Sequence, residues 1–361
     1  MIETNMQSIY VHIPFCKSRC RYCDFFSTTQ LDRRKEYVDT LLAEWASYPH
    51  HTPNTLYLGG GTPSMLDVED IKRIIDAIAT KDTTEITMEA NPGDLTLDKL
   101  VALRQAGVNR LSIGVQTFRT PLLRLIGRRH TGREARQAVR WAQKAGFNNI
   151  SIDLMYALPR QTMVQWSMDV RKAVRMGVQH ISCYCLTYEE GTPMCESLKK
   201  GEFRAATERL QNRMYQFLCK VLKRQGYEHY EVSNFALPGY RSRHNSNYWN
   251  DTPYIGLGAG AHSYDGNKRW WNPCDLDIYM QGIKNNNLQR ETEDLTDEQH
   301  HIERVMLGLR TSEGIEEQEV SYAAAKVNDY INRGLLMRQG SRLVATQEGL
   351  NILNRIIEDL L

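Results

Sequence analysis

The first two thirds of the sequence alternate short apolar runs with longer amphipathic stretches, and this alternation restricts the possible folds more than any other feature. Nearly continuous apolar runs fall at 8–13, 55–58, 85–90, 110–116, 149–155 and 180–186. Such runs are typical of strands covered on both faces. Stretches with helical periodicity fall between and after them, at 36–46, 68–79, 97–106, 133–145, 165–176 and 205–223. Six successive β–α units predict a parallel α/β sheet that curves into a barrel or part of one.

Polar and glycine residues collect where these predicted strands end. In parallel α/β folds the ligand site lies at the carboxyl ends of the strands. Five of the predicted strands have such candidates at or just past their ends, namely Gly59–Thr62, Glu89, Gln116, Asp153 and Thr187. One polar residue at a strand end means little, but five strands in succession predict a common site.

Three cysteines, Cys16, Cys20 and Cys23, follow the first predicted strand at C-x3-C-x2-C spacing. A disulfide framework belongs to short secreted chains, so this trio in a chain of 361 residues indicates a metal site. Structural zinc takes four ligands, for which Asp24 or His12 would have to complete the set. A [4Fe–4S] cluster on three thiolates keeps one iron open, and the spacing favours this cluster. Of the five other cysteines, Cys183 and Cys185 alternate along an apolar run, which predicts small core residues.

The text around the trio, Tyr10-x-His12-Ile13-Pro14-Phe15-Cys16-x3-Cys20-x-Tyr22-Cys23, resembles the radical S-adenosylmethionine superfamily and, within it, the HemN/HemW branch. The resemblance covers essentially the whole chain. It implies a partial (β/α)6 barrel with the cluster loop after strand one. It also implies that S-adenosylmethionine chelates the open iron and that reduction of the cluster cleaves it to methionine and a 5′-deoxyadenosyl radical.

The resemblance also assigns roles to the residues at the strand ends. It assigns the cofactor-binding positions to Tyr10, Tyr22, Gly60, Gly61, Thr62 and Glu89, and those around a second cofactor molecule in HemN-type enzymes to Gln116, Arg128 and Asp153. Read alone, the glycines suit a simple tight turn and the polar side chains suit ordinary hydrogen-bonding roles. The number of cofactor molecules stays open.

Two functions are known within this branch: oxygen-independent coproporphyrinogen III oxidase (HemN) and haem chaperone (HemW). Three features of the sequence favour the haem-chaperone hypothesis. Phe25 stands where HemN-type enzymes carry a fourth motif cysteine, and Cys16 follows only fifteen residues. Finally, 244–249 reads His-Asn-Ser-Asn-Tyr-Trp, similar to the HNxxYW motif that the HemW group associates with haem. The oxidase remains the alternative, so whether the chain is an enzyme stays undecided.

His244 is accordingly the candidate haem ligand. A neutral imidazole is a standard axial ligand of haem iron. Tyr248 and Trp249 offer rings for the macrocycle, and Arg241 and Arg243 offer guanidinium groups for its propionates. The alternative is a loop that packs on the barrel, with His244 as a hydrogen-bonded structural residue.

Charge and hydropathy restrict the partners. Lys and Arg number 45 against 43 Asp and Glu, a net charge of +2 that gives no case for nucleic acid or an anionic membrane. No apolar run approaches the roughly 20 residues of a membrane span, and the first residues lack a signal-peptide pattern, so we expect a cytoplasmic protein. The expected partners are haem, a haem-accepting protein, a flavodoxin-type electron donor that faces Lys17, Arg19 and Arg21, and a second copy in a homodimer.

The sequence divides into three parts. Residues 1–235 carry the barrel pattern and the cluster loop. Residues 236–295 are aromatic and rich in glycine, which predicts strands and loops that extend the sheet and carry the HNxxYW motif. Residues 296–361 read as two helices, a short hairpin and a final helix capped by Thr346, and predict a winged-helix-like module used for packing or partner docking.

Overall fold

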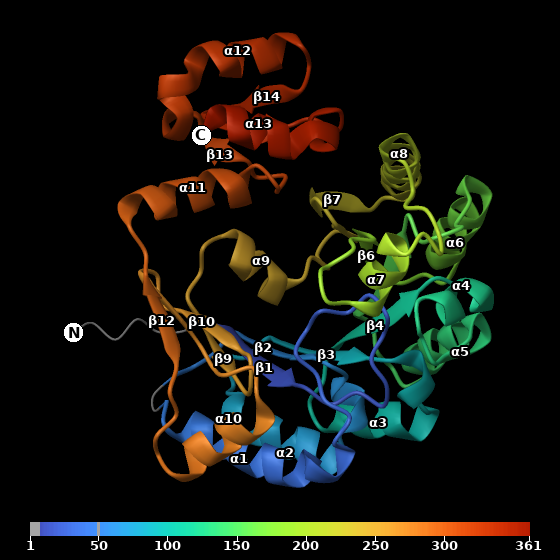
Figure 1. Ribbon diagram of the computed structural model, residues 1–361, viewed down its shortest axis with the longest axis vertical. Coiled ribbons are helices and arrows are strands. Elements are labelled where there is room, and N and C mark those ends of the chain that lie inside the picture. Colours follow the sequence, from blue (N-terminus) through green and yellow to red (C-terminus); the bar gives the residue numbers. More distant parts are fainter. Residues whose placement is uncertain (1–7, 49–50) are drawn as a thin grey trace.

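A twelve-stranded sheet forms the body of the protein in the computed structural model, which describes residues 8–48 and 51–361. Its centre is six parallel strands in chain order, β1 (Ser8–Ile13), β2 (Thr55–Gly60), β3 (Glu85–Ala90), β4 (Arg110–Gln116), β5 (Ile150–Tyr156) and β6 (His180–Cys185). The sheet curves without closing (Figure 1). The predicted partial (β/α)6 barrel is confirmed.

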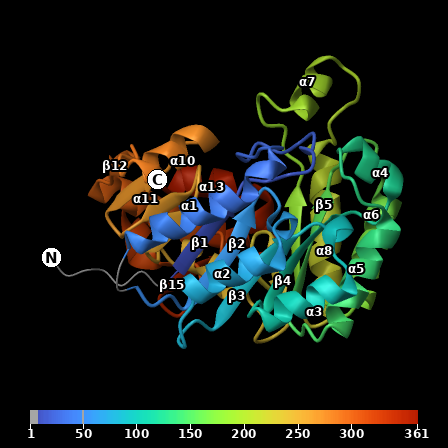
Figure 2. The same cartoon turned by 90° about the horizontal axis from the view of Figure 1, so that it is seen from below.

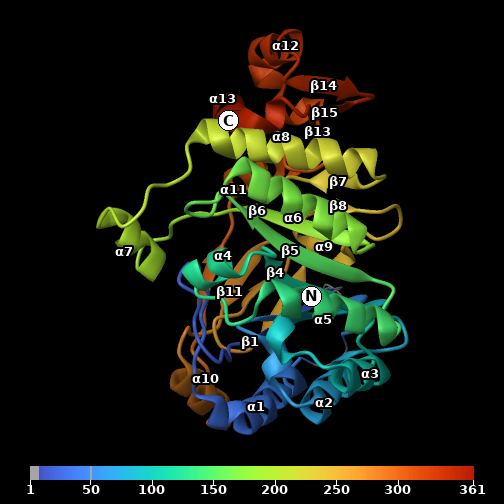
Figure 3. The same cartoon turned by 90° about the vertical axis from the view of Figure 1, so that its right-hand side faces the viewer.

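Amphipathic helices pack on the outer, convex face of this sheet (Figure 3). They are α1 (Arg34–Ala46), α2 (Val68–Ile78), α3 (Leu97–Gln105), α5 (Gly132–Lys144), α6 (Met163–Arg175) and α8 (Glu208–Arg224). Reciprocal capping boxes begin α5 at Thr131 and Glu134 and α6 at Thr162 and Gln165. Because such caps are local in sequence, the helices lie within about three residues of their predicted positions.

The inner face of the sheet is polar and aromatic, unlike the outer face. Along β5, for example, Ile150, Ile152 and Leu154 point into the hydrophobic core, whereas Ser151 and Asp153 alternate with them. The strands are therefore buried on both faces, as predicted, but only one face is packed by aliphatic side chains. The other face surrounds the interior of the partial barrel.

Further strands extend both edges of the sheet. At one edge β9 (Tyr254–Leu257) runs parallel to β1 and is followed by antiparallel β10 (His262–Tyr264), β11 (Lys268–Trp271) and β12 (Glu291–Asp294). At the other edge β8 (Asn234–Ala236) and β7 (Glu228–Glu231) follow β6. Shorter elements connect these parts, namely α4 (Thr120–Leu125), α7 (Pro193–Lys199), α10 (Leu276–Lys284) and the 3-10 turns η1 (Leu31–Arg33), η2 (Pro63–Met65) and η3 (Pro92–Asp94).

The segment around the HNxxYW motif is a helix, α9 (Arg243–Trp249), and the prediction of a strand or loop there was wrong. Ser242 caps this helix by accepting a hydrogen bond from the Asn245 N–H at 3.4 Å. The Glu85 carboxylate accepts from the Arg243 and His244 N–H groups at 3.0 and 3.1 Å. A carboxylate at a helix N-terminus is favourable, so a residue distant in sequence fixes where α9 begins.

The C-terminal segment forms a module with its own core, made by residues such as Val305, Val327, Leu343 and Ile356. Its elements are α11 (Asp297–Gly308), β13 (Ile315–Glu316), η4 (Glu317–Ala323), α12 (Ala324–Asn332), β14 (Leu336–Gln339), β15 (Arg342–Ala345), η5 (Gly349–Ile352) and α13 (Leu353–Leu360). Helices with a small β-wing confirm the winged-helix-like fold. A separate core supports the proposed division at 296, and the three-part division remains a proposal.

The final helix differs from its prediction. Thr346 accepts a hydrogen bond from the Gly349 N–H at 3.1 Å, but this cap begins only the short turn η5, and α13 starts at Leu353. Among the described residues no helix is long and apolar enough to cross a membrane. Residues 1–7, where the sequence predicts no signal peptide, lie outside the described part of the chain.

Candidate functional site

A cavity of about 980 Å³ lies at the carboxyl ends of the parallel strands. This volume is at the upper end of the range for ligand sites, roughly 300–1,000 Å³. Most residues predicted from the sequence line it: Cys16, Cys20, Tyr22, Cys23, Gly60, Gly61, Thr62, Glu89, Gln116, Arg128 and Asp153. Tyr10 and His244 do not line it. Figure 2 shows the cysteine loop, in dark blue after β1, on the same side of the molecule as α7.

The cysteine loop forms one wall of the cavity. Backbone hydrogen bonds from Cys16 N to Thr28 O (2.8 Å) and from Thr28 N to Pro14 O (2.7 Å) close the loop at its base. Its three cysteines are free and half-buried. Within 8–48 and 51–361, no group of three His, Cys, Asp or Glu side chains is close enough to hold one metal ion. Three separated thiols around an open space fit a multi-atom cluster better than the closed four-ligand set of structural zinc.

Glycine is required beside the cluster loop. A Cβ atom on Gly61 would lie 3.1 Å from Cys16 Sγ and 2.8 Å from the carbonyl carbon of Pro14. The neighbouring Gly60 has φ of +109°, a conformation that side-chain-bearing residues rarely adopt. Thr62 Oγ1 lies 3.4 Å from Cys16 Sγ. The Gly-rich turn after β2 therefore leaves room for the sulfur ligands and is more than a simple tight turn.

Arg128 crosses the cavity wall toward the cysteines. Its guanidinium donates to Gly114 O at 2.6 Å and to Cys20 Sγ at 3.6 Å. A Cβ atom on Gly114 would lie 2.8 Å from this guanidinium, so the strand glycine makes the approach possible. Burial lowers the pKa of Arg128, but the nearby Tyr22 and Cys20 raise it by more, so the side chain keeps its charge. That charge offsets thiolates on the loop.

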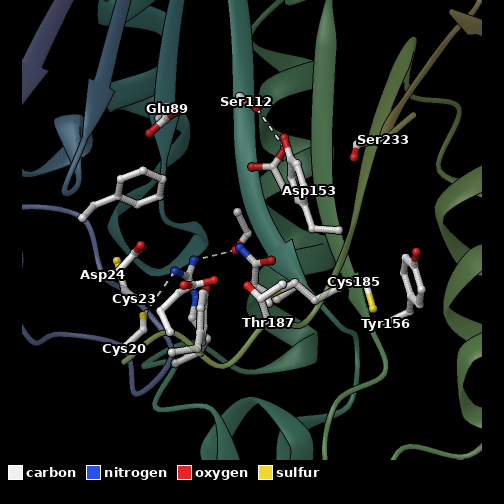
Figure 4. Close-up of a pocket in the computed structure, with 18 of the residues that line it drawn as sticks. Cys20, Cys23, Asp24, Glu89, Ser112, Asp153, Tyr156, Cys185, Thr187 and Ser233 are labelled. Atoms are coloured by element: carbon white, nitrogen blue, oxygen red, sulfur yellow. Dashed lines mark hydrogen bonds between the residues drawn. The ribbon is translucent and has the colours of Figure 1, made fainter. Parts of the chain in front are cut away.

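Two half-buried carboxylates, Glu89 and Asp153, face the cavity from β3 and β5. Tyr57 donates a hydrogen bond to Glu89 at 2.8 Å. Ser112 donates to Asp153 at 3.1 Å, as Figure 4 shows. Burial, reinforced by the charge of Asp153, raises the pKa of Glu89 to about 7. Burial also raises the pKa of Asp153. Glu89 can therefore accept hydrogen bonds from a cationic ligand or hold a proton near neutral pH.

The wall opposite the cysteine loop is aromatic. Tyr156, Tyr184 and Tyr215 line it together with Cys185, and Figure 4 shows Cys185 and Tyr156 across the cavity from Cys20 and Cys23. Tyr184 is 41% exposed. Cys183 is buried as predicted, but Cys185 is half-buried and lines the cavity, so the core prediction was wrong for it. Cys185 is the last residue of β6, where the strand leaves the packed sheet.

His244 lies at the opposite end of the barrel. It is 1% exposed, and its Nδ1 is 2.9 Å from the hydroxyl of Thr55, the first residue of β2. Its Nε2 is 3.0 Å from the Tyr248 hydroxyl, and its ring stacks on Tyr57 with centroids 5.0 Å apart. Burial lowers the pKa of His244 to about 3, so the ring is neutral. In this arrangement both ring nitrogens are engaged within the protein.

Tyr10 lies inside the barrel between the two ends. Its ring stacks on Tyr57 with centroids 6.1 Å apart, and its hydroxyl is 3.1 Å from His12 Nδ1. Tyr57 thus contacts Tyr10 and His244 through its ring and Glu89 through its hydroxyl. The sequence pattern did not single it out. Its alternation with Leu56 and Leu58 along β2 was the available signal for an inward-facing side chain.

Tyr230 is a second junction that the sequence reading missed. Its hydroxyl is 2.7 Å from His180 Nε2 and accepts from the Ser242 N–H at 3.4 Å, at the start of α9. Its carbonyl accepts from the Ser312 N–H at 2.9 Å, and Val232 N donates to Arg310 O at 3.0 Å. These backbone bonds attach the C-terminal module to β7.

Comparisons with known proteins agree with this geometry. A family model described as the Radical SAM superfamily matches residues 10–173. The solved structure of the coproporphyrinogen III oxidase HemN from Escherichia coli superposes with a TM-score of 0.82 over 99% of this chain and 90% of that chain, at 23% identity. The fold and the cysteine loop therefore define a radical SAM protein, with a [4Fe–4S] cluster and S-adenosylmethionine as its cofactors.

Curated relatives define the group more closely. The chain is 37% identical to the heme chaperone HemW of Lactococcus lactis over 98% of this chain and 97% of that protein. It is 34% identical to HemW of Bacillus subtilis, over 95% of this chain and 96% of that protein. With HemW of Escherichia coli it shares 36% identity over 73% of this chain and 71% of that protein. The chain belongs to the HemW family, which confirms the resemblance found in the sequence.

Proposed function

We propose that this protein is a haem chaperone that binds haem in the carboxyl-end cavity and passes it to an acceptor protein. The observation that carries the proposal is the match to curated HemW relatives, named heme chaperones, along nearly the full length of both chains. The geometry supports it with a cavity of about 980 Å³ that has a cysteine loop on one wall and tyrosines on the other.

Cys16, Cys20 and Cys23 would hold the cluster, and Gly60, Gly61, Thr62 and Glu89 would contact S-adenosylmethionine. When bound, the cluster supplies one electron and an open iron site. The chain's own residues prepare this wall. Arg128 offsets thiolate charge at Cys20, and Gly61 leaves the space that the sulfur atoms need. Glu89, whose pKa is about 7, offers a hydrogen-bond acceptor for an ammonium group.

A second cofactor molecule around Gln116, Arg128 and Asp153 is part of the proposal. Gln116 is held in a left-handed conformation with φ of 64°, and its side chain lies beside Gly114 near the Arg128 guanidinium. A non-glycine residue in this region is strained, and such strain is retained where the position is fixed by its surroundings. Isothermal titration of S-adenosylmethionine into the reconstituted protein would give the number of molecules bound.

The tyrosine wall suits a flat apolar ligand. Rings of Tyr156, Tyr184 and Tyr215 present aromatic faces and edges with polar tips, which favours stacking on an extended macrocycle. Cys185 adds a soft sulfur atom on the same wall. A binding site built of these side chains would exclude water from one face of haem.

A ligand role for His244 stays a prediction. For His244 to reach haem iron, α9 has to leave its position, because Thr55 and Tyr248 now occupy both ring nitrogens. Release would also break the bonds from Glu85 to the start of α9. Haem ligation by His244 would thus accompany a second arrangement of this helix.

The other partners are proposals as well. Lys17 and Arg19 are exposed beside the cluster and could receive an acidic, flavodoxin-type electron donor, whereas Arg21 is bound to Ser197 of α7 at 2.7 Å. A homodimer and a cytoplasmic location are further parts of the proposal.

The test is an anaerobic haem titration of the cluster-reconstituted protein, followed by absorbance. We expect a saturable Soret band at one haem per chain. Absence of specific haem binding would overturn the chaperone proposal, and release of 5′-deoxyadenosine with decarboxylation of coproporphyrinogen III would establish the oxidase instead. A parallel titration of His244→Ala decides the ligand prediction, since loss of haem without loss of helix content would support it.

A further inference from the structure

The cavity extends well beyond the part that the cluster and S-adenosylmethionine would use. Its far end is lined by polar residues of α8, the turn between β7 and β8, and the C-terminal module, including Gln211, Asn212, Ser233, Arg310, Asn351 and Asn354. None of these residues was singled out by the sequence pattern, and none belongs to the cofactor positions. The C-terminal module therefore contributes directly to the wall of the site.

Arg310 is the cationic group of this far end. It follows α11, and its backbone carbonyl accepts from Val232 N, so its position is fixed by the junction between module and sheet. Its guanidinium donates to Met306 O at 2.6 Å and to Asn354 Oδ1 at 2.9 Å. Both acceptors are neutral.

Arg310 has no carboxylate partner in the described part of the chain. Among the described residues, no Asp or Glu oxygen lies within ion-pair distance of its guanidinium, whereas Arg129, which also lines the cavity, is paired with Asp94 at 3.0 Å. Partial burial lowers the pKa of Arg310, with no neighbouring charge opposing the effect. A partly buried cation without an anion is unfavourable, and a carboxylate from a ligand would relieve this.

Donors remain available for such a ligand. A guanidinium has five N–H donors, and the two bonds to Met306 and Asn354 leave three. Its planar fork matches a carboxylate, and the two existing bonds hold it in place before the ligand arrives.

We propose that Arg310, oriented by Asn354, is the carboxylate-binding residue of the cavity and receives a propionate of the tetrapyrrole whose ring lies on the tyrosine wall. The proposal rests on the proposed function and adds the orientation of the bound tetrapyrrole. Its ring faces Tyr156 and Tyr215, and its propionate edge faces the C-terminal module. Haem then bridges barrel and module, so occupancy of the cavity and docking of the module are linked.

The test uses two probes, haem and its dimethyl ester, which lacks free carboxylates. Each is titrated anaerobically into the full-length, cluster-reconstituted protein and into Arg310→Met. We expect the wild type to bind haem about tenfold more tightly than the ester, since a charge-assisted bidentate contact is roughly worth that factor. Arg310→Met should bind both probes equally, at the affinity of the wild type for the ester.

Arg355→Met is the matched control, because Arg355 lies on the same module, is exposed and does not line the cavity. It should keep the tenfold preference. Asn354→Ala should keep part of it. A preserved preference in Arg310→Met would overturn the carboxylate assignment while leaving haem binding intact. Equal binding of the two probes by the wild type would overturn it as well. Failure of the wild type to bind either probe would overturn the proposed function and this inference with it.

Discussion

The two ends of the barrel carry similar side chains in different surroundings. At the carboxyl end, Arg128, Glu89 and Asp153 face an open cavity beside free thiols. At the amino end, Glu85 and His244 are buried by α9 and bonded to neighbours fixed in the fold. Polar residues inside a barrel are therefore not evidence of a site by themselves. What separates a site from a structural network is whether the groups still have donors, acceptors and space available.

The largest effect we expect follows the removal of a cluster ligand. The carboxyl-end cavity should lose its cluster, and the amino end of the barrel should keep its structure. In Cys23→Ser, reconstitution should fail to build a [4Fe–4S] cluster, because two thiolates do not hold the cube. Iron and sulfide content and electron paramagnetic resonance measure the loss. Cys183→Ser, on the same type of residue in the packed core, should keep its cluster. Unchanged cluster content in Cys23→Ser would remove the distinction between these cysteines.

Removing Glu85 should destabilise the amino end of the barrel and leave the carboxyl-end cavity able to hold its cluster. Glu85→Ala leaves the first N–H groups of α9 and the Ser242 hydroxyl without their acceptor, which should cost about 3–5 kcal/mol of unfolding free energy. Chemical denaturation measures this, with Glu69→Ala on the exposed face of α2 as the control. Cluster loading should stay near wild type. A loss below 1 kcal/mol would mean that α9 does not depend on this carboxylate.

The pH dependence of stability should distinguish the carboxylate at the open end. The pKa of Glu89 is about 7 in the folded protein, raised mainly by burial from 4.5. The folded state therefore binds the proton more tightly, so the contribution of Glu89 to stability is fully present below pH 4.5 and is lost as pH rises to about 7. Glu89→Gln should lack this loss and gain about 3 kcal/mol relative to wild type across that window. Unfolding at several pH values without added S-adenosylmethionine tests this, and parallel curves for the two proteins would contradict it.

The smallest expected effect concerns space beside the cluster. In Gly61→Ala the new Cβ would press on Pro14 and Cys16, which should cost about 1–3 kcal/mol and weaken S-adenosylmethionine binding. Gly93→Ala meets its nearest atoms only at 3.6–3.7 Å and serves as the control. Calorimetric binding of S-adenosylmethionine measures both. Equal affinities would show that the turn tolerates a side chain.

Local patterns predicted the parts of the molecule that are determined locally. The six parallel strands and their helices follow from apolar periodicity and caps such as Thr131, and the cluster loop follows from cysteine spacing. Helix α9 could not be predicted from local patterns, because its start depends on Glu85. This residue lies 158 positions before Arg243 in the chain. The start of α12 at Ala324 also depends on the fold, since Val320, in the preceding turn η4, is buried with φ of −123°.

The same distinction applies to the site. Residues at the ends of the first six strands could be placed from order along the chain, because parallel strands bring their carboxyl ends to one edge. Arg310 and Asn351 could not, since they reach the cavity only through the docking of the C-terminal module, and Tyr215 could not, since it lies on α8. Cys185 shows this: it shares its alternation with Cys183, yet only one of them is packed in the core.

The bonds of Tyr230 have a thermodynamic consequence. One residue contacts His180 at the amino end, Ser242 before α9, and Ser312 of the module. Elements that share such a residue tend to melt together, although the module has its own hydrophobic core. Scanning calorimetry should therefore record a single cooperative transition for the wild type. Tyr230→Ala removes the hydroxyl contacts with His180 and Ser242 but keeps the backbone bond from Ser312, so the transition should move to lower temperature and stay single.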